Sequence, residues 1–130
     1  MDAAPTQPIG DDMPQQNLVA EQLADILSVI AHPKRIRIIE ELGARELDVH
    51  TLAEKLGLRQ STLSQHLALL RTRGIAVPRR EGREVKYSLA SPWLAQWLVD
   101  GFQLFEFQGG KSSKVLRAAK EVRRLWRVRK

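Results

Sequence analysis

The sequence QSTLSQHLALLRTRG, residues 60–74, decides the fold of this 130-residue chain. Its leucines recur at three- and four-residue spacing, as the apolar side chains on one face of a helix do, at Leu63, Leu67 and Leu70. The other faces carry mostly short polar side chains: Ser61, Ser64, Gln65, His66 and Thr72. Gly74 is expected to end the helix. The segment therefore predicts a helix that buries one leucine stripe and exposes groups able to form hydrogen bonds.

Three helices are predicted before this segment, and local signals mark their ends. Apolar residues at helical spacing run from Leu18 to Ile30. Pro33 ends that helix, because the residue before a proline is pushed out of helical geometry, and it can open a second helix. Asp48 is a plausible N-cap for a short third helix over residues 49–56. A short turn then leads into the leucine-striped helix.

The pattern changes from helical to alternating after the leucine-striped helix. Residues 84–89 alternate between apolar and polar, and the turn at Glu81-Gly82-Arg83 separates them from a second apolar stretch at 75–77. This pattern predicts a two-stranded hairpin with basic residues at its tip. Pro78 cannot donate a ladder hydrogen bond, so its strand should lie at an edge or carry a bulge.

Two more helices are predicted after the hairpin. Ser91-Pro92 is typical of a helix start, with a serine N-cap and a proline in the first position, and a broad apolar surface follows up to about Phe107. Beyond a hinge at Gly109-Gly110, apolar residues mark one stripe of a basic amphipathic helix. The expected fold class is mainly α with a small β-hairpin wing, in the order α-α-α-α-β-β-α plus a C-terminal basic helix.

The charge is concentrated in two blocks. The formal net charge is +6, but residues 111–130 carry nine basic residues and one acidic residue, and residues 59–89 carry seven basic and two acidic residues. Two basic blocks on an otherwise acidic body suggest a polyanionic partner. The absence of cysteine excludes disulfides, thiolate metal sites and cysteine nucleophiles. No Gly-rich phosphate loop or acid/base pair is visible, so we expect neither enzyme activity nor a cofactor.

The predicted order of elements is typical of proteins that bind duplex DNA: a short helix, a turn, the leucine-striped helix and a basic hairpin. A helix fits the major groove, where Ser, Thr and Gln side chains can reach base edges. Arginines near the hairpin tip can reach phosphates or the adjacent minor groove. We therefore expect a protein that binds duplex DNA. The residues expected to contact DNA are Gln60, Ser61, Thr62, Ser64, Gln65, His66, Arg79, Arg80 and Arg83.

The residues from about Leu27 to Leu89 resemble the ArsR/SmtB winged-helix repressors of bacteria and archaea. The resembling stretches are Ala31-His32-Pro33-Lys34-Arg35-Ile36-Arg37-Ile38, Leu52-Ala53-Glu54-Lys55-Leu56-Gly57-Leu58 and Gln60-Ser61-Thr62-Leu63-Ser64-Gln65-His66-Leu67. The resemblance implies a homodimer built on the first and last core helices, which binds a pseudo-palindromic operator and represses transcription. It also implies base contacts from Gln60, Ser61, Ser64 and Gln65, with Arg83 at the wing.

The apolar surface after the hairpin supports dimerisation independently of the resemblance, because it exceeds what one winged domain needs to cover a single helix. A dimer would place two recognition helices roughly 34–36 Å apart, one turn of DNA. The residues expected at this interface are Leu18, Leu23, Trp93, Leu94, Trp97, Leu98, Phe102 and Phe105. The alternative is that the last core helix packs only on its own domain.

The sequence leaves a metal or small-molecule effector open. Many relatives sense metals through two cysteines in a stretch like Glu-Leu-Cys-Val-Cys, and this chain has Asp48 and His50 in their places. A carboxylate and an imidazole could hold zinc or nickel, but two ligands are too few. Helix capping by Asp48 with a solvated His50 is the simpler interpretation. We expect no metal site, and a metal-responsive repressor that uses these two residues is the alternative.

The chain is expected to have three parts: a flexible arm at 1–16, a winged helix-turn-helix DNA-binding and dimerisation domain at 17–107, and a basic extension at 108–130. No apolar run is long enough to span a membrane and no secretion signal is visible, so we expect a cytoplasmic protein. The stretch 111–130 is expected to lie near the DNA and to contact phosphates. The alternatives are a helix that packs on the dimer, a partner protein or an anionic membrane surface. A protein-interaction module is the rival to DNA binding.

Overall fold

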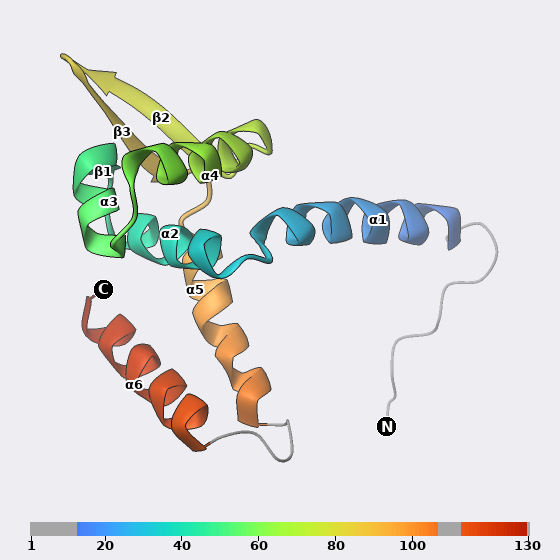
Figure 1. The fold of residues 1–130 in the computed structure, drawn as a ribbon. Helices are drawn as coiled ribbons and strands as arrows, with labels where there is room; N and C mark the ends of the chain where they lie inside the picture. Colours follow the sequence, from blue (N-terminus) through green and yellow to red (C-terminus); the bar gives the residue numbers. More distant parts are fainter. Residues whose placement is uncertain (1–12, 107–112, 130) are drawn as a thin grey trace.

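The computed structural model describes residues 13–106 and 113–129. Within them the chain is mainly helical and carries one small antiparallel sheet (Figure 1). The elements in chain order are α1 (Met13–Ile30), α2 (Pro33–Ala44), β1 (Leu47–Asp48), α3 (Val49–Leu56), α4 (Gln60–Thr72), β2 (Ala76–Glu81), β3 (Glu84–Leu89), α5 (Trp93–Asp100), the 3-10 helix η2 (Gly101–Glu106) and α6 (Ser113–Arg129). This is the predicted order with a third strand added.

The core forms where α2, α3, α4 and α5 meet. The leucine stripe predicted from the sequence is confirmed, because Leu63, Leu67 and Leu70 of α4 are all fully buried. They pack in one cluster with apolar side chains of α2, α3 and α5: Ile38, Ile39, Leu42, Leu52, Ala53, Ala95 and Val99. Burial of this stripe turns the polar side chains of α4 away from the core.

The hairpin is confirmed, and it belongs to a three-stranded sheet with the order β1-β3-β2. Pro78 lies opposite Tyr87 on β2, which is an edge strand and pairs only with β3. The missing N–H of Pro78 therefore costs no hydrogen bond to a strand on the other side. The strand β1 was not predicted. It pairs with β3 through only two positions, Leu47 with Tyr87 and Asp48 with Lys86, and a two-residue strand has no periodicity to detect.

Local capping explains where the short helix α3 begins and ends. One carboxylate oxygen of Asp48 accepts the backbone N–H of Thr51 at 3.1 Å, and the other accepts its hydroxyl at 2.7 Å, which confirms the predicted N-cap. Gly57 ends the helix in the left-handed conformation, with φ of 64°. The sharp end leaves the short turn that separates α3 from α4, as a helix-turn-helix requires.

Three predicted boundaries differ from the structure. The helix α1 begins at Met13, inside the segment expected to be a flexible arm, and residues 1–12 lie outside the described residues. No side-chain hydrogen bond from Ser91 caps α5, although its backbone carbonyl accepts the N–H of Leu94 at 3.0 Å. The helix predicted up to Phe107 changes to 3-10 geometry at Gly101. Phe107 and the predicted hinge at Gly109-Gly110 also lie outside the described residues.

The helix α1 extends away from the rest of the protein (Figure 1). Its C-terminal end packs on the core through Ile30, and an ion pair between Asp25 and Arg73 ties it to the end of α4. Its N-terminal half exposes apolar residues, including Leu18, which is 57% exposed, and Val19, which is 65% exposed. In the described part of the chain, no helix has both the length and the apolar character needed to cross a membrane.

The basic helix α6 folds back against α2 and α5. Trp126 is 4% exposed, and its indole N–H donates a hydrogen bond of 2.7 Å to the side-chain oxygen of Gln96. Gly43 makes room for this contact, because a Cβ there would collide with Ala95 and approach Trp126. Figure 1 draws α4 above α2 and α6 below it. The expectation that this segment lies near the same DNA as α4 is therefore not supported, and the alternative of a helix packed on the domain is favoured.

Candidate nucleic-acid interface

The outer face of α4 carries four exposed polar side chains in its first two turns: Gln60, Ser61, Ser64 and Gln65. They point away from the core because they alternate at helical spacing with the buried leucines. Among the described residues, only Gln60 of these four has a side-chain hydrogen-bonding partner, a contact of 3.2 Å between its Nε2 and the Nδ1 of His50. These side chains therefore keep donors and acceptors for an external ligand.

Two of the predicted DNA contacts, Thr62 and His66, are half-buried rather than exposed. His66 faces α2, where the guanidinium of Arg35 lies 3.1 Å from its Nδ1. Arg35 can only donate, so the Nδ1 of His66 accepts and the imidazole is neutral. The His32 ring lies beside it, with 4.7 Å between ring centroids. The structure thus gives His66 an internal role between α4 and α2, and its contact with DNA stays a prediction.

The pKa of His66 agrees with that internal role. Burial lowers it from the ordinary value, and electrostatic repulsion from His32, Arg35 and Lys34 lowers it further. A proton on Nδ1 would also replace the acceptor that Arg35 uses. The orientation of α4 on α2 is therefore held by an uncharged His66 at neutral pH.

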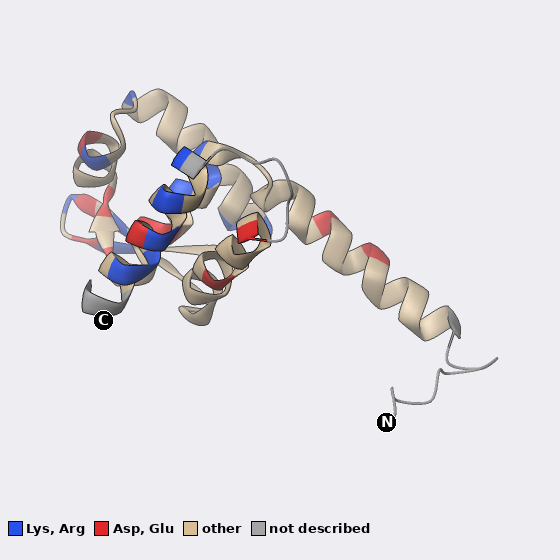
Figure 2. Ribbon diagram, turned by 90° about the horizontal axis from the view of Figure 1, so that it is seen from below, with Lys and Arg blue, Asp and Glu red and all other residues tan. Residues whose placement is uncertain are grey.

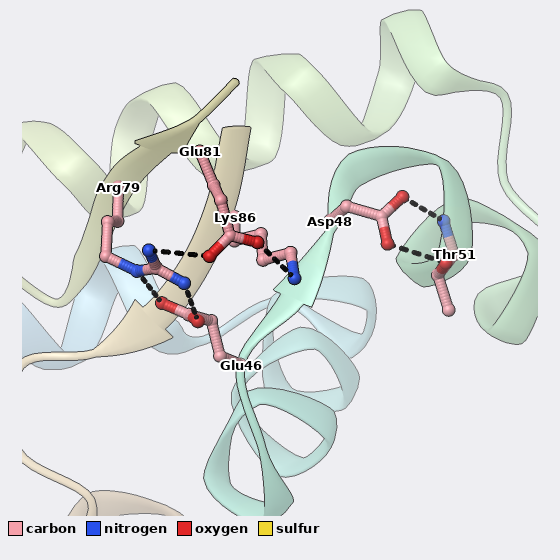
Figure 3. Close-up of polar contacts among 6 residues, drawn as sticks. All are labelled: Glu46, Asp48, Thr51, Arg79, Glu81 and Lys86. Atoms are coloured by element: carbon pink, nitrogen blue, oxygen red, sulfur yellow. Dashed lines mark hydrogen bonds and ion pairs between the residues drawn. The ribbon is translucent and has the colours of Figure 1, made fainter. Parts of the chain in front are cut away.

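A network of charged side chains fixes the outer half of the hairpin (Figure 3). Arg79 on β2 makes two hydrogen bonds to Glu46, which precedes β1, at 2.9 and 2.6 Å. It also donates to Glu81 at 3.1 Å, and Lys86 on β3 pairs with the other oxygen of Glu81 at 3.0 Å. The two-pronged contact holds the hairpin against the segment that leads into α3.

The pKa values of this network show which charges it stabilises. Hydrogen bonds from Arg79 lower the pKa of Glu46, and those to Glu46 and Glu81 raise the pKa of Arg79. Arg79 is one of the residues predicted to contact DNA, but its guanidinium already donates hydrogen bonds to the carboxylates of Glu46 and Glu81. Arg80 and Arg83 are exposed and make no ion pair with any described residue. These two arginines are the hairpin cations left for an external anion.

Replacing Glu46 by glutamine should loosen the hairpin. The substitution removes the charge that Arg79 holds, so the backbone amides of β2 and β3 should lose protection against hydrogen exchange. Glu84→Gln is the matched control, because Glu84 is exposed on the same hairpin and makes no ion pair within the described residues. Equal protection in Glu46→Gln and the unchanged protein would contradict the anchoring.

The lowered pKa of Glu46 sets the pH range over which its ion pair with Arg79 stabilises the hairpin. The folded value lies below the ordinary value, so the ion pair stabilises the fold fully above the ordinary glutamate pKa and is lost as the pH falls through the lowered value. The difference in protection between Glu46→Gln and the unchanged protein should therefore shrink only in acid.

The two candidate metal ligands have other partners. Both oxygens of Asp48 are used by Thr51, and the hydrogen bond from the Thr51 hydroxyl is the main reason for the lowered pKa of Asp48. His50 is exposed and lies near Glu54 and Gln60. Across residues 13–106 and 113–129, no three His, Cys, Asp or Glu side chains gather as metal ligands would. This arrangement fits helix capping better than coordination.

The residues predicted at a dimer interface gather around α1, α5 and η2. Leu18, Leu23, Trp93 and Trp97 are exposed, at 57%, 49%, 64% and 46%. Leu94, Leu98, Phe102 and Phe105 are half-buried, and the first three pack against the core. Two grooves adjoin them. One of about 380 Å³ lies between α1 and α5, and one of about 710 Å³ is lined by α5, η2 and the end of α1.

Comparison with known proteins relates this geometry to a family. The sequence profile described as "Bacterial regulatory protein, arsR family" matches residues 32–76, the stretch from α2 to the start of β2. The biofilm growth-associated repressor of Agrobacterium fabrum is 36% identical over 93 residues, which cover 72% of this chain and 80% of that protein. The chain belongs to the ArsR family of bacterial regulatory proteins. The family consists of transcriptional regulators rather than enzymes.

Other relatives extend the likeness of this ArsR-family protein. Nodulation protein NolR of Rhizobium meliloti is 42% identical over 78 residues, 60% of this chain and 64% of NolR, so the match spans somewhat less than two thirds of that relative. The crystal structure of NolR from Sinorhizobium fredii superposes with a TM-score of 0.63 at 35% identity, covering 77% of this chain and 96% of that one. The fold is a winged helix-turn-helix, and the chain is a DNA-binding transcriptional repressor of the ArsR type.

Two features of this ArsR-family site were not predicted from the sequence. Glu46 and Lys86 hold the wing, and Arg35 with His32 holds His66 against α2. Their charge and polarity were visible, but a contact between residues about thirty positions apart depends on the packing of helices and strands. The His32-Pro33 pair was noted only as a helix boundary, and His32 does cap α2 by accepting the backbone N–H of Lys34 at 3.1 Å.

Proposed function

We propose that this ArsR-family protein represses transcription as a homodimer that binds a pseudo-palindromic operator. In this proposal α4 enters the major groove and reads base edges with Gln60, Ser61, Ser64 and Gln65. Arg80 and Arg83 contact phosphates or the minor groove beside it. The observation that carries the proposal is the exposed polar face of α4 together with two exposed wing arginines that make no ion pair with any described residue.

The second half of the proposal is the dimer. An α1 that extends from the body and exposed tryptophans on α5 leave more apolar surface uncovered than an isolated domain usually exposes. A second copy would cover this surface and would set the spacing of the two α4 helices. A spacing of roughly 34–36 Å matches one turn of duplex DNA.

Selection of binding sites from a random duplex library tests the function directly. We expect enriched sequences with two inverted half-sites whose centres lie about one helical turn apart. Binding of the enriched duplex and of a scrambled duplex is then compared by fluorescence anisotropy at several salt concentrations. Equal affinity for both duplexes would contradict sequence-specific binding. Repeating the titration with divalent metals and with chelator tests the remaining alternative, a metal-responsive repressor.

Replacing Gln65 by alanine should weaken binding to the selected site and relax preference at one base position. Loss of a two-pronged amide contact to a base costs about 1–3 kcal/mol of discrimination. Anisotropy titrations with single-base variants of the site measure the effect. Ala68→Ser is the matched control, because Ala68 is exposed on the same side of α4, about one turn nearer the C-terminal end of the helix. An equal loss for Gln65→Ala on random DNA would contradict base reading.

A further inference from the structure

The exposed side of α6 is a cationic surface separate from α4 and the wing. Arg117, Lys120 and Arg124 are all exposed and follow one another at three- and four-residue spacing, so they share one side of the helix. Glu121 is the single acidic residue of the stretch 111–130, which has nine basic residues. It pairs with Arg124, while Arg117 and Lys120 make no ion pair with any described residue.

The other side of α6 is only partly covered by the rest of the chain, since Val115, Val122 and Leu125 on it are 41%, 37% and 46% exposed. Trp126 and Ala119 are buried, and the hydrogen bond from Trp126 to Gln96 fixes the helix on α5. A second ion pair, between Arg123 and Glu106 at 3.8 Å, ties α6 to η2. A helix that binds a lipid surface inserts its apolar side. Here Trp126, the largest apolar side chain of α6, is buried against the domain and is not available for insertion. The cationic side is the one that α6 presents outward, and its blue segments are visible in Figure 2.

The position of α6 relative to α4 and the wing determines which polyanion its cationic side can contact. Figure 1 draws the wing and α4 on one side of α2 and α6 on the other, and Figure 2 shows α6 toward the viewer when the protein is seen from below. A straight duplex on α4 therefore lies on the side of the domain opposite α6. The exposed cations of α6 within the described residues are Lys114, Arg117, Lys120 and Arg124, and the planar guanidinium group of arginine suits phosphate oxygens.

We propose that the cationic side of α6, formed by Arg117, Lys120 and Arg124, binds the phosphate backbone of a second DNA duplex. A protein bound to its operator through α4 then holds another DNA segment on its opposite side, without regard to the sequence of that segment. The inference rests on the proposed function, because the first duplex is the one that α4 holds. Contacts of this kind are electrostatic and depend steeply on salt.

A capture assay with two duplexes tests the proposal. The protein is saturated with a biotinylated duplex that carries the selected site, collected on streptavidin beads, and incubated with a fluorescent random-sequence duplex. The triple variant Arg117→Gln, Lys120→Gln, Arg124→Gln should capture about a hundredfold less of the second duplex near physiological salt, because three phosphate contacts are lost. The matched control Arg117→Lys, Lys120→Arg, Arg124→Lys keeps every charge and should capture as the unchanged protein does. All three positions are exposed, so both variants should fold.

Three results would overturn the proposal. The first is equal capture of the fluorescent duplex by both variants, or no capture although protein is present on the beads. The second is a shallower salt dependence of the glutamine variant on the single site duplex, which would mean that α6 contacts the same DNA as α4. The third is binding of α6 to vesicles of anionic phospholipid without capture of DNA. Failure of the proposed function looks different, because the protein itself would then be missing from the beads.

Discussion

Replacing Trp97 by glutamate should convert the proposed dimer into a monomer and abolish tight operator binding. Trp97 is 46% exposed in the single chain and lines both grooves beside α5, so a charge there is harmless to the monomer and costly in an apolar interface. Sedimentation should show a mass near 14.8 kDa for the variant and twice that for the unchanged protein. Loss of the second half-site contact should weaken operator binding about a hundredfold or more.

A control separates this effect from general damage. Val77 on β2 is exposed to a similar extent, 42%, and lies away from α5. Val77→Glu should therefore remain dimeric, and both variants should keep the helical circular dichroism of the unchanged protein. A Trp97→Glu variant that sediments as the unchanged protein does would place the subunit interface elsewhere.

Replacing Leu67 by alanine should cost the fold about 2–5 kcal/mol, the range measured for truncation of a fully buried leucine. Leu67 is 1% exposed and lies in the stripe that α4 buries against the core. The total stability of a domain of this size is about 5–15 kcal/mol, so the loss is a large share of it. Urea unfolding at one fixed protein concentration measures the change, since unfolding of a dimer depends on concentration.

The same helix supplies the control for that experiment. Leu69 is 48% exposed, only two residues from Leu67, and its truncation to alanine should change stability by no more than about 0.5 kcal/mol. Comparable losses in the two variants would mean that α4 does not bury its stripe as described. The pair therefore tests the orientation of α4, on which the exposure of its polar face depends.

The arrangement of the fold was predictable where local patterns carried it. The leucine period located α4, Asp48 and Gly57 marked the ends of α3, and alternation located the hairpin. Each of these signals acts over one or two turns, so neighbouring residues in the sequence are enough to detect it. The strand β1 escaped because two residues have no period, and its partner β3 is about forty residues away.

The candidate site was predictable only in part, for a related reason. The exposed residues of α4 follow from helical geometry once the buried stripe is known. The pairing of Arg79 with Glu46 and the turn of His66 toward Arg35 depend on contacts between distant elements. Composition also revealed the basic C-terminal segment, but it could not show on which side of the molecule this segment lies. That position depends on the packing of α6 through Trp126 and Gly43.

The sparse attachment of α1 to its own subunit has a consequence for how the finished molecule arises. Most of the stability of a helix in a protein comes from tertiary packing, and for α1 little beyond the Asp25–Arg73 pair and the last turn supplies it. In a newly synthesised monomer, α1 would unfold and refold repeatedly until a second subunit packed against it. Complete folding of the repressor would then require the association of two chains. The cellular concentration of the protein would therefore determine the fraction of chains with a folded α1, as well as the occupancy of DNA.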